Sequence, residues 1–489
     1  MQARAVRRVT FAVGAILAGA LLLDARAVTP SAQGPVTFSE HVAPIVFANC
    51  TPCHRPGEAA PFSLMSYRDV RPLAKAIASA TASRAMPPWK AGPSDYPFAG
   101  ARQLSVDQIG TIQRWVADGA LEGDPARTPP LPRFTAGWQL GPPDLTVSME
   151  QAFEVPARGP DVYRNFVLPL NLERDTWVRA IDFRPSARGA VHHSLFFLDV
   201  TGASRERDAS DPLPGFPGGM GGTRVTGTGR GRGAFGALLA GRGASNDDSL
   251  ARATGSLGGW ALGGRALELP SGLAFFAAKG SDLILSTHFH PSGKVEHEKS
   301  TVGLYFASSP PTQAFTTIQL PPVFGVFEGL DIPPDEAHYT IKDSFVIPVD
   351  VRAFSVGAHA HYLGKQMQLT ATLPGGTTKT LLRIDDWDFS WQERYRFADF
   401  VSLPKGTRLD AELSYDNSSA NKRNPSRPPV RVSWGEESTD EMGSIGLQVI
   451  AASAADLPQL RQAFLAHVRQ AAVTRPGLRQ LLLRRQQIQ

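Results

Sequence analysis

The chain has 489 residues, 42% of them hydrophobic, which is enough for about three domains with buried cores. Its formal net charge of +5 is carried by the two ends. Residues 1–27 contribute +3 and residues 455–489 contribute +5, so the body between them is net negative. Because the body also lacks a basic stripe interleaved with aromatic residues, nucleic acid is excluded as a partner.

Residues 1–27 have the pattern of a secretory signal peptide. Arg4, Arg7 and Arg8 precede an apolar run at 11–23, and small residues at an A-x-A spacing close the segment. This run is shorter than the roughly 20 residues that a transmembrane helix needs, although a retained anchor is the alternative. We therefore expect an exported, periplasmic protein with no integral membrane segment once the signal is cleaved.

The chain contains only two cysteines, and both belong to one motif. Cys50 and Cys53 are separated by two residues, and His54 follows directly. Two thiols at this spacing can add to the vinyl groups of a haem, and the adjacent imidazole can bind its iron. A redox-active disulfide of the thioredoxin type would need a βαβ context, which the surrounding sequence lacks. The motif predicts one covalent c-type haem.

A methionine thioether is a common second axial ligand of such a haem. Met86 lies 32 residues after His54 in a proline-rich loop and is the preferred candidate. Met65 is the alternative, but core packing is the simpler explanation for it because methionine is an ordinary gap-filling residue. We therefore predict that His54 and Met86 bind the iron from its two sides.

The sequence around the haem motif is helical in pattern. Apolar residues recur at helical spacing over 39–49 and 105–120, and Ser105 is suited to be an N-cap. Residues 35–125 are therefore predicted to form a small all-α cytochrome c domain. A proline-rich run then predicts a stiff linker at 126–143.

Beyond the linker, the pattern changes to short segments rich in Val, Phe, Leu and Thr, separated by Pro, Gly and Asn. This pattern is typical of an antiparallel β-sandwich. A break at 308–311 divides the region into two all-β domains, and a Gly-rich stretch at 215–264 is interpreted as a long insertion. The predicted ranges are 144–309 and 310–453 for the β domains and 454–489 for a basic helical tail.

Three pairs of histidines stand in apolar, strand-like sequence of the β region. They are His192 and His193, His288 and His290, and His359 and His361. Neutral imidazole is the commonest metal ligand in proteins. For one histidine an ordinary core or surface role would be the better explanation, but the three pairs together predict metal binding.

Spacing decides which of these histidines can share an ion. His359 and His361 are two residues apart, so on a strand both side chains leave the same face. His192 and His193 are adjacent and would leave opposite faces, so they can share an ion only at a bulge or a strand end. Further along, Met442 offers a thioether that could join a histidine pair and favour copper, since soft sulfur binds Cu(I).

In order and spacing, these segments resemble the copper type II, ascorbate-dependent monooxygenases, which include the peptidylglycine α-hydroxylating and dopamine β-monooxygenases. The resemblance covers residues 144–452 and rests on the adjacent pair His192 and His193, on His288 within LILSTHF, on the pair within HAHYLGK, and on Trp434-Gly435 leading to the DEM segment. It implies two jelly-roll-like β domains that bind two coppers. The implied ligands are His192, His193 and His288 at the first copper and His359, His361 and Met442 at the second.

In that family, the copper with the methionine ligand activates dioxygen for hydrogen abstraction from a C–H bond, and the all-histidine copper supplies an electron. The resemblance therefore implies that His359, His361 and Met442 form the catalytic centre for hydroxylation of a small-molecule substrate. We expect an external donor, an ascorbate-like reductant or another redox protein, to supply electrons through or beside the haem. The alternatives are a haem and copper protein for electron transfer and a binding scaffold, both without hydroxylase activity.

Two features depart from the family. His290 shares a strand face with His288, so it is expected to orient that ligand or a bound water, or to replace a ligand. The peptide-amidating member has an arginine two residues before its HxH pair, and an asparagine and a tyrosine after its ligand methionine. Here those positions hold Gly357, Ser444 and Gly446, which argues against a carboxylate-terminated peptide as substrate.

Overall fold

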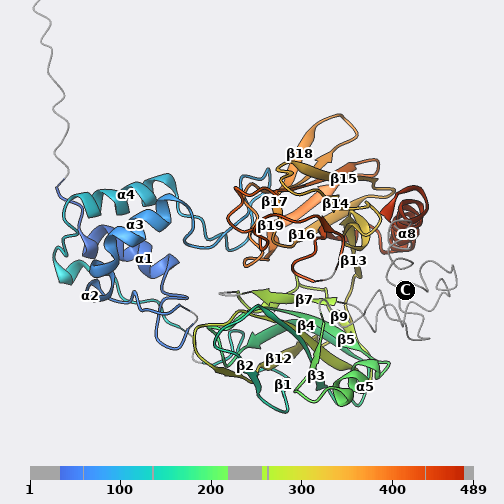
Figure 1. Cartoon of the computed structure of the whole chain (residues 1–489), viewed down its shortest axis with the longest axis horizontal. Helices are drawn as coiled ribbons and strands as arrows, with labels where there is room; N and C mark the ends of the chain where they lie inside the picture. Colours follow the sequence, from blue (N-terminus) through green and yellow to red (C-terminus); the bar gives the residue numbers. More distant parts are fainter. Residues whose placement is uncertain are drawn as a thin grey trace, which may run out of the picture. The chain divides into compact units, whose positions relative to one another are not determined.

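The computed structural model describes residues 34–58, 60–134, 137–218, 256–261, 264–435 and 437–477 (Figure 1). The predicted signal peptide, most of the Gly-rich insertion and the end of the C-terminal tail lie outside these residues. Within them, antiparallel strands predominate, and the helices are few and mostly short. No helix in these ranges has both the length and the apolarity needed to cross a bilayer.

Short helices occupy the first part of the described chain, coloured blue to teal in Figure 1. They are η1 Phe38–Val42, α1 Ala43–Asn49, α2 Tyr67–Val70, η2 Arg71–Leu73, α3 Ala74–Ala82, α4 Val106–Ala117 and η3 Pro125–Arg127. The helices predicted at 39–49 and 105–120 are confirmed. Ser105 caps α4, since its Oγ accepts from Gln108 N at 3.1 Å and its N donates to Gln108 Oε1 at 2.9 Å. Phe38, Val46 and Trp115 belong to the small core between these helices.

The stretch between α3 and α4 leaves this core. Ala91 forms an isolated antiparallel bridge with Ile384, and Phe98 forms another with Phe397. The rings of Phe98 and Phe397 also stack, with centroids 5.3 Å apart. A segment that the sequence assigned to the helical domain therefore also packs against strands of the second β domain.

In its described residues, the first β domain has ten strands in two antiparallel sheets, and a further two strands pair with each other. Its strands are β1 Leu145–Ser148, β2 Phe153–Val155, β3 Val162–Pro169, β4 Thr176–Arg184, β5 Val191–Asp199, β6 Phe216–Pro217, β7 Ser256–Ala261, β8 Leu267–Glu268, β9 Phe275–Ala277, β10 Asp282–Phe289, β11 Glu296–Glu298 and β12 Thr301–Phe306; α5 Ala203–Ser210 follows β5. One sheet has the order β1-β12-β4-β8, with β9 also paired to β4, and the other has the order β6-β3-β10-β5-β7. Strand β11 pairs with β2.

The two sheets of this domain enclose one apolar core. Leu283 and Leu285 of β10 and Val302 and Leu304 of β12 are fully buried in it. Every residue of β10 is buried, so this strand is covered on both faces, as its near-continuous apolar sequence indicates. A histidine near the end of such a strand is therefore held in a dry environment.

The second β domain is also a pair of antiparallel sheets. Its strands are β13 Phe315–Leu320, β14 Asp331–Ile332, β15 Tyr339–Val346, β16 Val351–Ala360, β17 Gly364–Thr372, β18 Thr378–Ile384, β19 Arg394–Leu403, β20 Arg408–Tyr415, β21 Val432–Ser433 and β22 Gly443–Ala451, with η5 Pro322–Gly325, η6 Ala454–Asp456 and α8 Leu457–Thr474. The four-stranded sheets have the orders β13-β22-β16-β19 and β15-β20-β17-β18, and β14 pairs with β21. The division predicted at 308–311 falls between β12 and β13.

The second β domain packs against both the first β domain and the C-terminal helix. Phe354 of β16 and Ile450 of β22 belong to the core of the first β domain. At the C-terminal end, α8 covers the second domain and buries Leu457 and Leu460 in its core. The described region from β1 to β22 is therefore mostly antiparallel β-sheet, as the sequence predicted, with only α5 and η5 as short helices, and its two sandwiches share buried side chains.

Candidate metal centres

The first centre depends on a β-bulge. In the ladder between β5 and β10, His193 pairs with His288, and the next pair is Val191 with Phe289. His192 is therefore the extra residue of a β-bulge. Two adjacent histidines can share an ion at such a bulge, as the sequence analysis required. Ring centroids of His192 and His193 lie 5.0 and 4.8 Å from that of His288.

The three imidazoles of this first centre suit a metal ion. One ligand nitrogen from each of His192, His193 and His288 lies within 4.8 Å of the others. Nδ1 of His193 and Nδ1 of His288 are 3.4 Å apart. Nδ1 of His192 is buried and has no hydrogen-bond partner among the described residues. A buried polar atom without a partner is costly, and a bound cation would satisfy it.

Burial keeps these imidazoles neutral. It lowers the pKa of His192 to about 4, and it lowers the pKa of His193 well below the usual histidine value. Burial also lowers the pKa of His288, against the opposing effect of a nearby carboxylate. At neutral pH all three rings therefore carry a free lone pair, the form in which histidine binds metals.

Asp161 holds the outer side of this centre. Its carboxylate oxygens lie 2.7 Å from His288 Nε2 and 2.8 Å from His290 Nδ1, and Tyr362 Oη donates to it at 2.6 Å. Burial would raise the pKa of Asp161, but its hydrogen bonds with His288, Tyr362 and His290 contribute in the opposite direction, and the pKa is lowered overall. A carboxylate at Nε2 fixes the ring so that Nδ1 of His288 faces His193.

The second centre lies at the end of β16. The rings of His359 and His361 are 5.3 Å apart and nearly perpendicular. His359 Nδ1 is 2.5 Å from Gln392 Oε1, and His361 Nδ1 is 3.2 Å from Asp440 O. Both contacts use Nδ1, so Nε2 of each ring remains available to bind a metal ion. Nε2 of His359 is buried and has no hydrogen-bond partner in the described ranges. Burial lowers the pKa of His359 to about 4 and that of His361 to about 3.

Strand register brings Met442 to this pair of histidines. In the ladder between β16 and β22, His359 pairs with Ser444 and Ala360 pairs with Gly443. Continued by one position, this register sets Met442 opposite His361. The side chain of Met442 is 1% exposed. Two imidazoles and a thioether at one end of a strand pair form a ligand set that suits copper.

Glu441 fixes the backbone of the second centre, and the sequence analysis did not find it. Its buried carboxylate accepts hydrogen bonds from the backbone N of His361 at 2.6 Å, of Leu363 at 2.9 Å and of Met442 at 2.9 Å. Burial raises the pKa of Glu441 to about 8, against the lowering effect of these donors. An acidic residue directly before the candidate ligand methionine was the only sequence signal.

One phenylalanine ring lies between the two centres. The centroid of Phe389 is 5.5 Å from that of His288, 6.0 Å from that of His193 and 5.4 Å from that of His361. A hydrogen-bonded path runs beside it, because Tyr362 follows His361 and bonds to the carboxylate that holds His288. Histidines of the two β domains are therefore coupled by one ring and by one carboxylate.

The haem motif forms a tight turn after α1. The backbone N of Cys53 and of His54 donates to Cys50 O at 3.1 and 2.9 Å, which keeps the three side chains together. Both thiols are free, and burial raises the pKa of Cys50 to about 12. The His54 ring faces that of Phe62, with centroids 4.6 Å apart. Met86 lies beyond α3 and is 40% exposed, and its role as axial ligand stays a prediction.

The loop after this motif contacts the segment that leads into the first centre. Glu58, four residues after His54, forms an ion pair with Arg188, which lies four residues before His192. Arg55 also pairs with Glu58, at 2.7 Å. The haem motif and β5 are therefore joined by a charged contact.

Comparison with known proteins gives little. No protein family and no curated protein matches this chain. The similar solved structures include that of infectious bursal disease virus Gx strain, 9% identical, covering 63% of this chain and 72% of that one with a TM-score of 0.17. They also include the VP2 subviral particle of that virus, 10% identical over 64% and 73% of the two chains, again with a TM-score of 0.17. Likeness at this level carries no argument, so the site rests on its own geometry.

Proposed function

We propose that this chain is a copper-dependent monooxygenase that hydroxylates a C–H bond of a small-molecule substrate with dioxygen. The observation that carries the proposal is the pairing of two different ligand sets beside one ring, Phe389. The proposed ligands are His192, His193 and His288 at the first centre and His359, His361 and Met442 at the second. In each set a buried imidazole nitrogen lacks a hydrogen-bond partner among the described residues.

Copper at the second centre would supply dioxygen activation, and copper at the first would supply an electron. Hydroxylation of one C–H bond takes up one dioxygen, two electrons and two protons, and it releases one water. The electrons must come from an external donor, an ascorbate-like reductant or a redox protein. The ion pair between Glu58 and Arg188 supports electron entry through a haem bound at Cys50, Cys53 and His54, because it holds the motif loop against the segment before His192.

The chain's own residues would prepare both centres before any metal binds. Asp161 and Gln392 orient His288 and His359 through ring nitrogens on the side away from the proposed ion. Glu441 holds the backbone on both sides of the second centre. Because the polar atoms that orient each ligand are already bonded, little reorganisation is needed on metal binding.

The finer structural assignments belong to the same proposal. We infer that the helical part around α1, α3 and α4 is a cytochrome c domain, with Met86 as the second axial ligand. The two sandwiches are then jelly-roll-like copper domains of the monooxygenase family. Export to the periplasm fits this assignment, because c-type haem is attached to its two cysteines in that compartment.

Metal analysis tests the proposal directly. Protein matured in a periplasm with haem-attachment machinery and loaded with copper is expected to hold two coppers and one haem per chain. His192→Ala and His359→Ala should each retain one copper and the full haem spectrum. Cys50→Ala is the matched control, since it should lose covalent haem and keep both coppers. A wild-type chain with no specifically bound copper would refute the enzyme.

A further inference from the structure

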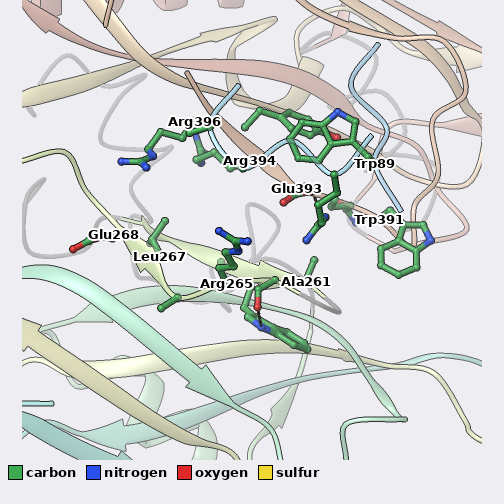
Figure 2. Close-up of a pocket in the computed structure, with 18 of the residues that line it drawn as sticks. Trp89, Ala261, Arg265, Leu267, Glu268, Trp391, Glu393, Arg394 and Arg396 are labelled. Atoms are coloured by element: carbon green, nitrogen blue, oxygen red, sulfur yellow. Dashed lines mark hydrogen bonds and ion pairs between the residues drawn. The ribbon is translucent and has the colours of Figure 1, made fainter. Parts of the chain in front are cut away.

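A cavity of about 450 Å³ adjoins the second centre (Figure 2). Its described lining comes from parts of 88–102, 139–140, 259–261, 264–268 and 391–396. Its volume falls in the range of roughly 300–1,000 Å³ that is usual for small-molecule sites. Gln392 belongs to its wall, and the Oε1 of this residue is 2.5 Å from Nδ1 of His359. The cavity and the second centre therefore share a side chain.

Positive charge dominates the wall. Among the described residues that line the cavity, five are cationic and two are carboxylates. Arg102 pairs with Glu393 at 2.6 Å, and Lys90 pairs with Asp388 at 3.5 Å. Figure 2 shows Arg265 on one side of the cavity and Glu393 on the other. Lys90 and Arg102 are therefore neutralised by carboxylates, and the other cations of the wall are not.

Arg265, Arg394 and Arg396 account for this excess of positive charge. In the described part of the chain, no carboxylate lies within ion-pair distance of any of these three guanidinium groups. Arg394 starts β19 and pairs with Gly357 of β16, two residues before His359, so no side chain stands opposite it there. Arg394 and Arg396 are both exposed to solvent and both line the cavity, so an anion in the cavity can reach either guanidinium. Hydrogen bonds from a guanidinium to an anion are charge-assisted and therefore stronger than those between neutral groups.

The rest of the wall provides flat apolar surface. Trp89, Trp260 and Trp391 line the cavity, and Figure 2 shows Trp89 and Trp391 at one end of it. Trp89 is fixed by an edge contact with Tyr395, with ring centroids 5.0 Å apart. Indole rings held in this way offer faces against which a planar or apolar body can pack.

We propose that this cavity binds an organic anion with an aromatic or similarly apolar body, its anionic group held by Arg394 with Arg396 beside it. A guanidinium fork matches a carboxylate or a phosphate with two parallel hydrogen bonds. This inference goes beyond the proposed function and does not name the anion as its substrate, because Gln392 contacts His359 at Nδ1, on the side away from the proposed ion. The binding itself does not depend on copper.

The test compares matched probes on the full-length, haem-loaded protein without copper. The probes are 3-phenylpropanoate, phenyl phosphate and the neutral 3-phenylpropanamide, with binding followed by titration calorimetry. At least one anion is expected to bind about tenfold or more tightly than the amide, as a charge-assisted hydrogen bond would give. The order of the two anions identifies the preferred group. Equal binding of both anions and the amide would overturn the proposal.

Variants assign the effect to the cavity. Arg394→Gln should weaken anion binding about tenfold and leave amide binding unchanged, while Arg394→Lys keeps part of the preference. The control is Arg408→Gln, which removes the same charge from the exposed Arg408–Asp410 pair on β20. An equal loss in Arg408→Gln would reduce the effect to net charge and refute the site.

Copper analysis of the same preparations keeps the two proposals apart. Two coppers per chain with no preference for anions would refute the anion site and leave the proposed monooxygenase unaffected. Anion preference with no specific copper would refute the monooxygenase and leave a binding site for organic anions.

Discussion

The two histidine centres solve the same problem in different ways. At the first, a bulge in β5 turns His192 and His193 toward His288, and the side chain of Asp161 orients the ligand set. At the second, the carboxylate of Glu441 accepts hydrogen bonds from the backbone N–H groups of His361 and Leu363. The first centre can therefore be tuned through one side chain, whereas the second is coupled to the stability of its domain.

Glu441→Ala should have the largest effect, because it removes the acceptor of three backbone N–H groups in a dry site. Each buried donor left without a partner costs about 1–3 kcal/mol, so we expect a loss of roughly 3–5 kcal/mol in the free energy of unfolding. Urea denaturation of copper-free protein measures it, and copper at the second centre should be lost as well.

Glu441→Gln is the matched control, because its amide oxygen still accepts hydrogen bonds. It should lose clearly less stability than the alanine variant. If the alanine variant has the same midpoint of urea denaturation as the wild type, Glu441 does not stabilise the second centre. The contrast between the two centres is then wrong.

Met442→Ala tests the second centre through its thioether. Loss of a residue that only orients a ligand typically weakens metal binding by about 10–100-fold. Loss of the ligand itself should weaken copper(I) binding by more than that. Competition with a copper(I) chelator measures the change, and the first centre should bind as in the wild type. Unchanged copper(I) affinity at both centres would remove Met442 from the ligand set.

Asp161→Asn tests the first centre in the same way. Because Asp161 orients His288 without binding the ion, copper affinity there should fall about 10–100-fold, with little change at the second centre. Tyr362→Phe removes only one of the hydrogen bonds to Asp161 and should have a smaller effect. Equal losses at both centres in Asp161→Asn would show that the centres are not independently supported.

Much of this arrangement could be predicted from local sequence. The N-cap at Ser105 and the need for a bulge at His192 follow from the local sequence, and the structure has both. Asp161 and Phe389 could not be found in this way. They lie far from the histidines in sequence, in stretches without a motif, and only strand pairing and domain contact bring them to the centres.

Arg394 shows the limit most clearly. Gly357 in place of the family's arginine argued against a carboxylate substrate, because sequence comparison looks for a function at one aligned position. Strand pairing instead sets Arg394 opposite Gly357 on the neighbouring strand. The residue that strand pairing sets opposite Gly357 cannot be identified from position 357 itself, so the guanidinium of Arg394 at the cavity could not be predicted from that position.

His290→Ala should have the smallest effect and decides a question that the sequence left open. Its side chain is 63% exposed and contacts Asp161 at 2.8 Å, on the oxygen that His288 does not use. If it only supports the carboxylate, the variant should keep two coppers and lose less affinity than Asp161→Asn. Loss of one copper would instead make His290 a ligand of the first centre, and the all-histidine set would have to be reassigned around it.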